Sequence, residues 1–308
     1  MAPKKQTTAL GNAGTRRAAA LLGTATCAET TNSTLVQEAR KIDISLSFVD
    51  PFTGSMRHTN CQVKTGNSYR AKCQRTDTIK LKAIDRPTRE KLERELGLIA
   101  WVPTKPSSAV YWFICRPGQS HAPITFRRQT QRVSPALRYI LARELAQRGA
   151  TPPFTQHKLK AFHDLTTTMK QAKAAYKSLK AGPVESPLFG KIQVSRAAWR
   201  HITRKGKSAK RRTVSLRIVP YLQKFLGARP CSHSVMDQEH STNGAESTET
   251  RMVVCWYRDA LIIDGTPRTL MLRVKEEITY PTEWYKYILQ ESDVSYRATL
   301  LSWWAKGE

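Results

Sequence analysis

Alternating apolar and polar residues predict a β-rich domain between residues 35 and 132. From residue 42 to 49 almost every second residue is apolar, which is typical of a strand that buries one face. In the segment 78–84 lysines alternate with apolar residues, so we expect this strand to show a basic face to solvent. A short helix with Asp85 as its N-cap follows. The predicted strands are 42–49, 56–63, 78–84, 98–102 and 109–115.

The spacing of apolar residues changes to three and four between residues 133 and 183, which predicts a helical connector. Ser134 is the predicted N-cap and Pro135 the first residue of a helix that ends at Gly149. A second, longer helix is predicted over 157–181. It has one apolar stripe, and lysines cover the rest of its surface. Those lysines either form a solvated face or extend a phosphate-binding surface.

Residues 184–308 are predicted to form a small, basic α+β module. A short helix capped by Ser195 leads into a basic loop over 205–212, and a further helix starts at Pro220. The stretch 232–250 is polar and acidic without apolar periodicity, so we expect a flexible loop there. Strands and a hairpin complete the module. The predicted fold class is therefore α+β, with a β-rich N-terminal half, central helices and this C-terminal module.

Residues 1–34 are predicted to be a disordered basic arm. They are rich in Ala, Thr and Gly and contain four Lys or Arg against one acid, a composition with little apolar surface to bury. A secretory signal would need a longer apolar run, and the glycines weaken the helix of an organellar presequence. An arm that contacts nucleic acid is the interpretation that we favour.

Positive charge is concentrated in one part of the chain. The 308 residues carry a net charge of +27, and residues 186–236 hold 12 Lys or Arg and no acid. Residues 237–308 are net acidic. A step this sharp predicts a polyanionic partner, with nucleic acid as the first choice. An anionic membrane surface is the alternative, but no basic helix has bulky aromatic anchors, and no apolar run is long enough for an integral membrane segment.

The predicted nucleic-acid contacts lie in the segment 200–212 and on the lysine-rich helix. Lys and Arg neutralise phosphates, so we expect low sequence specificity and a strong dependence on salt. The chain contains no zinc-finger spacing, zipper heptad or RNA-recognition signature, and RNA or single strands are slightly favoured over duplex DNA. The predicted contact residues are Arg200, His201, Arg204, Lys205, Lys207, Lys210, Arg211, Arg212, Lys173 and Lys177.

His201 is the candidate for catalysis if the protein is an enzyme. A metal-independent ribonuclease needs an acid–base group that titrates near neutrality, beside cations that hold the scissile phosphate. Tyr257 or Tyr280 is the candidate second proton donor. The segment 195–230, followed by a hairpin, resembles small metal-free ribonuclease toxins of the barnase and RelE type, which implies RNA cleavage. We favour packaging or scaffolding of nucleic acid, as in a coat, nucleocapsid or matrix-like protein, over cleavage.

The six cysteines are scattered, and none has CxxC spacing. We expect free thiols in a reducing, intracellular compartment, with the protein free or within a virion or nucleoprotein particle. Zinc held by Cys61, Cys73 and Cys115 with His58 or His121 is the alternative, although structural zinc ligands usually come in close pairs. No glycine-rich nucleotide loop is present, so the sequence predicts no metal site and no cofactor. The sequence is compatible with a homo-oligomer and does not fix the number of copies.

Overall fold

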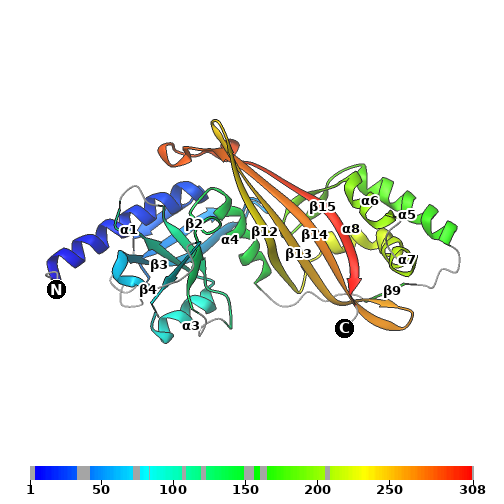
Figure 1. Ribbon diagram of the computed structural model, residues 1–308, viewed down its shortest axis with the longest axis horizontal. Coiled ribbons are helices and arrows are strands. Elements are labelled where there is room, and N and C mark those ends of the chain that lie inside the picture. The colour runs from blue at the N-terminus through cyan, green and yellow to red at the C-terminus, as the bar shows by residue number, and fades with distance from the viewer. Residues whose placement is uncertain are drawn as a thin grey trace. The chain divides into compact units, whose positions relative to one another are not determined.

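The chain divides into two compact units. The computed structural model describes residues 4–32, 42–71, 77–82, 84–105, 109–118, 123–148, 156–159, 165–204 and 209–306. Unit 1 comprises Met1–Leu145, Thr242–Ser247 and Tyr280–Val294, and unit 2 comprises Ala146–Ser241, Thr248–Thr279 and Ser295–Glu308. Each unit combines sheet with helices, so the α+β class is confirmed (Figure 1). The predicted connector 133–183 is divided between the two units.

Unit 1 is built on a five-stranded sheet with the strand order β1-β2-β3-β6-β7. β2 pairs antiparallel with β3, and β3 pairs parallel with β6. In β2, Ile44, Leu46 and Phe48 are buried as the alternation predicts. The strands are β1 (Glu29–Asn32), β2 (Ile44–Val49), β3 (Met56–Thr65), β6 (Leu98–Val102) and β7 (Tyr111–Ile114).

A smaller antiparallel sheet of unit 1 consists of β4 (Arg70–Ala71), β5 (Thr78–Leu81) and β8 (Thr125–Arg127). Its buried face packs against β6 and against helix α3 (Arg86–Glu95). The carboxylate of Asp85 accepts a hydrogen bond from the Thr88 backbone N–H at 3.1 Å, which confirms the predicted cap.

Helix α1 (Lys4–Thr26) occupies most of the region for which the sequence predicted a disordered arm over 1–34. Ala18, Leu22 and Ala25 follow a helical spacing, are at most 1% exposed, and lie in a helix that packs on β1, β2 and β3. Gly14 lies so close to Thr65 that an added Cβ atom would overlap its side chain. The prediction was wrong because a stripe of small residues is weakly apolar, yet it lets a helix approach a sheet closely.

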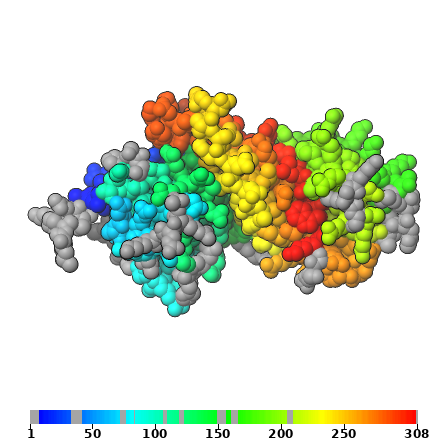
Figure 2. Space-filling view, in the orientation of Figure 1, coloured from blue at the N-terminus to red at the C-terminus, as the bar shows by residue number. Residues whose placement is uncertain are grey.

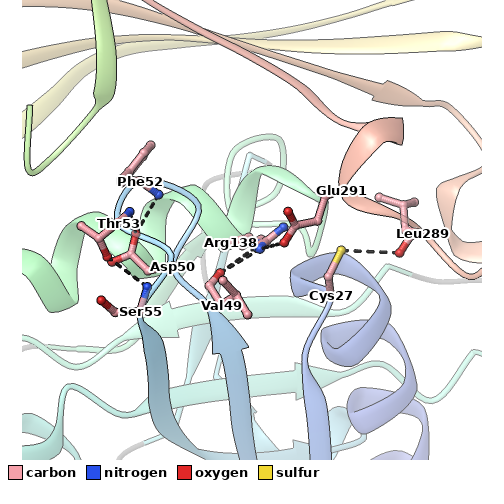
Figure 3. Close-up of polar contacts among 9 residues, drawn as sticks. All are labelled: Cys27, Val49, Asp50, Phe52, Thr53, Ser55, Arg138, Leu289 and Glu291. Carbon is pink, nitrogen blue, oxygen red and sulfur yellow. Dashed lines mark hydrogen bonds and ion pairs between the residues drawn. The ribbon is translucent and has the colours of Figure 1, made fainter. Parts of the chain in front are cut away.

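Helix α4 (Ala136–Gln147) confirms the helix predicted after Ser134. Its Arg138 is 5% exposed, donates two hydrogen bonds to the Val49 carbonyl at 3.1 and 2.8 Å, and pairs with Glu291 (Figure 3). The Cys27 thiol donates nearby to the Leu289 carbonyl at 3.6 Å. These contacts attach the segment 280–294, which connects β14 to β15, to β2 and α4 within unit 1.

Unit 2 contains a sheet with the order β10-β11-β15-β14-β13-β12, and β9 lies beside β13. Four helices cover one face of it (Figure 1). The strands are β9 (His157–Leu159), β10 (Val184–Ser186), β11 (Gly190–Val194), β12 (Ser232–Asn243), β13 (Glu246–Ile263), β14 (Thr266–Pro281) and β15 (Ser295–Lys306). The helices are α5 (Leu165–Lys180), α6 (Arg196–Thr203), α7 (Ala209–Ile218) and α8 (Leu222–Leu226). Short 3-10 turns lie at Asn67–Tyr69, Val219–Tyr221, Trp284–Lys286 and Glu291–Asp293.

The stretch 232–250 is not the flexible acidic loop that the sequence predicted. It forms β12 and the start of β13, joined through Gly244 with φ at 60°. β12 is exposed at most positions. Backbone pairing can maintain a strand with polar side chains on both faces, and such a strand has no apolar periodicity for sequence reading to detect.

Two other boundaries in unit 2 differ from the prediction. The long helix begins at Leu165, and His157–Leu159 pair in parallel with Leu261–Ile263 as β9. The predicted basic loop 205–212 is helical from Ala209, so Lys210, Arg211 and Arg212 lie on α7. Residues 160–164 and 205–208 lie outside the described part of the chain.

The core of unit 2 lies between the sheet and the four helices. Trp303 of β15 is completely buried, and its indole N–H donates to the Ser215 carbonyl of α7 at 2.8 Å. Trp304 points to the opposite face, where the Arg273 guanidinium lies 5.8 Å from its ring centroid. Of these adjacent tryptophans, only Trp303 therefore fixes the helices to the sheet.

Replacing Trp303 with leucine should lower the free energy of unfolding by about 3 kcal/mol, because a buried ring is lost and the Ser215 carbonyl loses a partner. Urea denaturation followed by far-UV circular dichroism measures this change. Trp304→Leu is the matched control and should cost about 1 kcal/mol or less, since it removes mainly the contact with Arg273. Equal losses in the two variants would contradict the anchoring role of Trp303.

Candidate nucleic-acid interface

Helices α5, α6 and α7 carry positive charge without any acidic residue. They contain four, two and four Lys or Arg respectively, and no Asp or Glu. On α5, Ala172, Tyr176 and Leu179 are buried in the core, so the lysines on the rest of the helix are exposed. Figure 2 shows these helices, green to yellow-green, at the surface beside the red strand β15.

A groove of about 580 Å³ lies between α5 and α6. Its lining residues recur at intervals of three and four on both helices, so each helix turns one face toward it. Five of the seven are cationic and two are aromatic. They are Lys173, Tyr176, Lys177, Lys180, Arg196, Trp199 and Arg200.

The two aromatic residues contact each other across the groove. The ring centroids of Tyr176 and Trp199 are 4.8 Å apart. Tyr176 is buried, whereas Trp199 is half-buried. Burial raises the pKa of the Tyr176 hydroxyl, and the Arg196 charge lowers it to a smaller extent. The Tyr176 ring thus packs against the indole, and Trp199 keeps part of its surface accessible.

Ser195 positions α6 beside α5. Its hydroxyl oxygen accepts a hydrogen bond from the Ala198 backbone N–H at 3.3 Å, as expected for an N-cap. Its carbonyl accepts a hydrogen bond from the Tyr176 hydroxyl at 2.8 Å. Ala198 and Ile202 are fully buried, so the remaining face of α6 is directed outward. Local capping and core packing together place Arg196 and Arg200 in the groove.

The cations of the groove are not neutralised by acids in the described part of the chain. No ion pair there involves Lys173, Lys177, Lys180, Arg196 or Arg200, and all five are exposed. Like charges held this close create a positive potential that attracts anions.

α6 also borders a second cavity, of about 690 Å³. This cavity brings together His201, Lys210 and Arg211, three of the predicted contact residues. Asp264 and Arg268 from the β13–β14 hairpin line it as well. Neither residue is among the predicted contacts, since the sequence predicts only a hairpin in this region. The other lining residues are Val214, Ser215, Ile263, Thr266, Trp304, Ala305 and Lys306.

The remaining predicted contacts are dispersed. Arg204 is exposed at the C-cap of α6, and Arg212 is half-buried on α7. Lys205 and Lys207 lie outside the described residues. Four groove residues that were not predicted as contacts are Tyr176, Lys180, Arg196 and Trp199. Their helical spacing was visible in the sequence, but the approach of α5 to α6 was not.

Tyr257 is a core residue and lines neither cavity. It is 3% exposed, and its hydroxyl donates to the Ala228 carbonyl at 3.4 Å. Burial raises the pKa of Tyr257 well above 10. The prediction that Tyr257 acts beside His201 as a proton donor is therefore corrected. Tyr280 is also buried, at 4% exposure.

The zinc alternative finds no support in the described residues. Cys61 and Cys115 are buried free thiols, and burial raises the pKa of Cys115 to about 12. Zinc binds the thiolate, which such burial disfavours. Cys73 and His121 lie outside the described residues, and within those residues no three His, Cys, Asp or Glu side chains gather as metal ligands would.

Comparison with known proteins gives no match to a family model, a curated protein or a solved structure. The resemblance of residues 195–230 to ribonuclease toxins stays a prediction. Among the described helices, none has both the length and the apolar character required to cross a membrane.

Proposed function

We propose that the protein binds nucleic acid through the groove between α5 and α6, by contacts with phosphates and with low sequence specificity. The observation that carries this proposal is the lining of the groove, which has five exposed cations, two aromatic rings and no acid. Lys and Arg that neutralise phosphates release condensed counterions, and this favourable contribution does not depend on base sequence.

The aromatic part of the groove favours single strands, RNA or DNA, as the ligand. Proteins that hold single strands combine a basic groove with aromatic side chains on which unpaired bases stack. Trp199 has accessible ring surface and is supported by Tyr176 at 4.8 Å. Bases in a duplex stack on one another, so they offer no free face to Trp199.

Packaging or scaffolding is the role that we propose for this binding. Many copies of a coat, nucleocapsid or matrix-like protein must cover one strand whatever its sequence. Contacts with the phosphate backbone meet that requirement, because they position a protein without reading bases. The net charge of +27 attracts a negatively charged strand to the chain as a whole.

Replacing Lys173, Lys177, Arg196 and Arg200 with glutamine should weaken binding and flatten its salt dependence. Each phosphate contact with a single strand contributes about 0.7 to the slope of log affinity against log salt, so the slope should fall by about 3. Fluorescence anisotropy with a labelled oligonucleotide between about 50 and 200 mM salt measures both quantities.

The matched control replaces four exposed cations elsewhere in unit 2 with glutamine: Lys158, Lys191, Lys224 and Arg258. This control changes the net charge by the same amount. Its slope of log affinity against log salt would fall as much as that of the groove variant only if total charge, rather than the groove, determined binding. An equal change in the two variants would remove the groove from the proposed function.

Trp199→Leu should weaken binding of single strands by about 5- to 100-fold, since stacking on an aromatic ring contributes about 1–3 kcal/mol per base. Binding of a duplex should change by less than about 2-fold, because its phosphates still reach the same cations. Competition assays with both ligands measure the ratio. Trp256→Leu, a half-buried tryptophan of unit 2 outside the groove, is the control. Equal losses for both ligands would argue against stacking.

Metal-independent RNA cleavage is the second candidate, because the structure places His201 in one cavity with Lys210 and Arg211. In this reaction His201 takes a proton from the 2′-hydroxyl, whose oxygen then bonds to phosphorus while the cations hold the phosphate. The bond from phosphorus to the 5′-oxygen breaks, and the 5′-oxygen takes up a proton from water or from the protonated His201. Asp264 lines the same cavity, and its carboxylate lies 3.4 Å from the Arg217 guanidinium.

His201→Ala should abolish cleavage of labelled RNA in the presence of a chelator and leave the affinity within about 2-fold, because the Lys and Arg side chains that contact the phosphates are unchanged. Gel analysis of the RNA and anisotropy measure the two effects. His240→Ala, exposed on β12, is the control. A wild-type protein that never cuts RNA, or a variant that cuts as fast, ends this second candidate.

A further inference from the structure

The small sheet of unit 1 has one apolar face and one cationic face. In β5, Ile79 and Leu81 are at most 3% exposed and pack in the core. Lys80 and Lys82 are exposed on the opposite face, because successive strand residues alternate. The antiparallel register of β5 and β8 places Arg127 on the face of the two lysines, and it too is exposed.

The side chains between these cations are small. Ala71 of β4 lies opposite Lys80 on one side, and Thr125 of β8 lies opposite it on the other. Neither side chain is long enough to screen the lysine, so the long cationic side chains are the groups that project from this face. A flat, extended ligand can therefore contact several cations at once.

An accessible aromatic ring lies at the edge of this sheet. Tyr69 is 42% exposed, and its carbonyl accepts a hydrogen bond from the Lys82 backbone N–H at 2.8 Å. The Lys64 ammonium lies 5.3 Å from the centroid of the Tyr69 ring. Unit 1 thus combines cations with an exposed ring, as the groove of unit 2 does.

Acidic residues do not neutralise this face. β4, β5 and β8 contain no Asp or Glu. Throughout the described ranges, no ion pair involves Lys80, Lys82 or Arg127. The charge of the face is available to an outside anion.

We propose that this face of unit 1 is a second nucleic-acid site, so that each chain binds two segments of single strand. The proposal rests on the function proposed for the groove, because both sites select the same class of ligand. A chain with two sites holds a long strand more tightly, since the second contact is intramolecular, and it joins two strands that are too short to reach both sites.

Native mass spectrometry with a strand of about ten nucleotides tests the proposal, because this length fits one site. At low salt the wild-type chain should bind two strands. The triple variant Lys80→Gln, Lys82→Gln and Arg127→Gln should bind one strand. In a separate capture assay, wild-type protein loaded with one strand should bind to a second strand on a surface, and the triple variant should not. Counting strands per chain separates two sites on one chain from an oligomer with one site per chain.

The matched control changes three other cations of unit 1: Arg16→Gln, Arg94→Gln and Lys105→Gln. These are exposed and lie outside the strands β4, β5 and β8, so this variant should still bind two strands. Hydrogen exchange is the second measurement and uses only wild-type protein. A saturating strand should slow exchange at the amides of β5 and β8, and unchanged exchange there would overturn the proposal even if the triple variant did not fold.

The outcomes separate this proposal from the function proposed for the groove. If the wild-type chain binds one strand, and the variant with four groove substitutions binds none, the groove is the site and the proposal for unit 1 is wrong. If the groove variant binds one strand and the triple variant none, unit 1 is the site and the groove proposal is wrong. A triple variant that still binds two strands also overturns the proposal.

Discussion

Mutual repulsion among the cations of α5 and α6 is the constraint that the packing of unit 2 must overcome. Five positive side chains line one groove, and no acid in the described residues offsets them. Apolar burial beneath them supplies the opposing free energy, through Tyr176, Ala198 and Ile202 and the rest of a core that reaches Trp303. The apolar core beneath α5 and α6 therefore stabilises the groove against the repulsion among its cations. A polyanion that binds in the groove reduces this repulsion.

This arrangement explains why the sequence predicted some parts of the site and not others. Some features of the site are local and can be predicted from neighbouring residues in the sequence. They are the charge of the segment 186–236, the capping serine at 195 and the apolar stripe on α5. The groove requires α5 and α6 to lie side by side, which depends on core contacts such as the hydrogen bond from Tyr176 to Ser195. No local pattern contains that information. The role assigned to Tyr257 failed for the same reason, since burial is a property of the whole fold.

The errors in the fold have a related cause. Periodicity detects elements that bury several large apolar residues, whereas α1 buries Leu22 among small residues and β12 is exposed at most positions. α1 packs through Ala18, Leu22 and Ala25 with Gly14 against Thr65, so close approach replaces bulk. β12 is maintained by backbone pairing within an exposed hairpin. In the β-rich first half, by contrast, burial alternates clearly in β2, and the strands predicted there are present.

The proposed binding of nucleic acid would also change, through its charge, how closely copies of the chain can pack. Chains that each carry +27 repel one another at distances within about 10 Å of their surfaces at moderate salt. A bound strand neutralises part of that charge and removes the main obstacle to close approach. The segment after residue 236 is net acidic and lowers the total charge of the chain. Helices α5, α6 and α7 contain no acid, so the positive charge on them is not reduced within the helices themselves. A packaging protein built in this way would pack closely only on the strand, so that the ligand itself limits where assembly occurs.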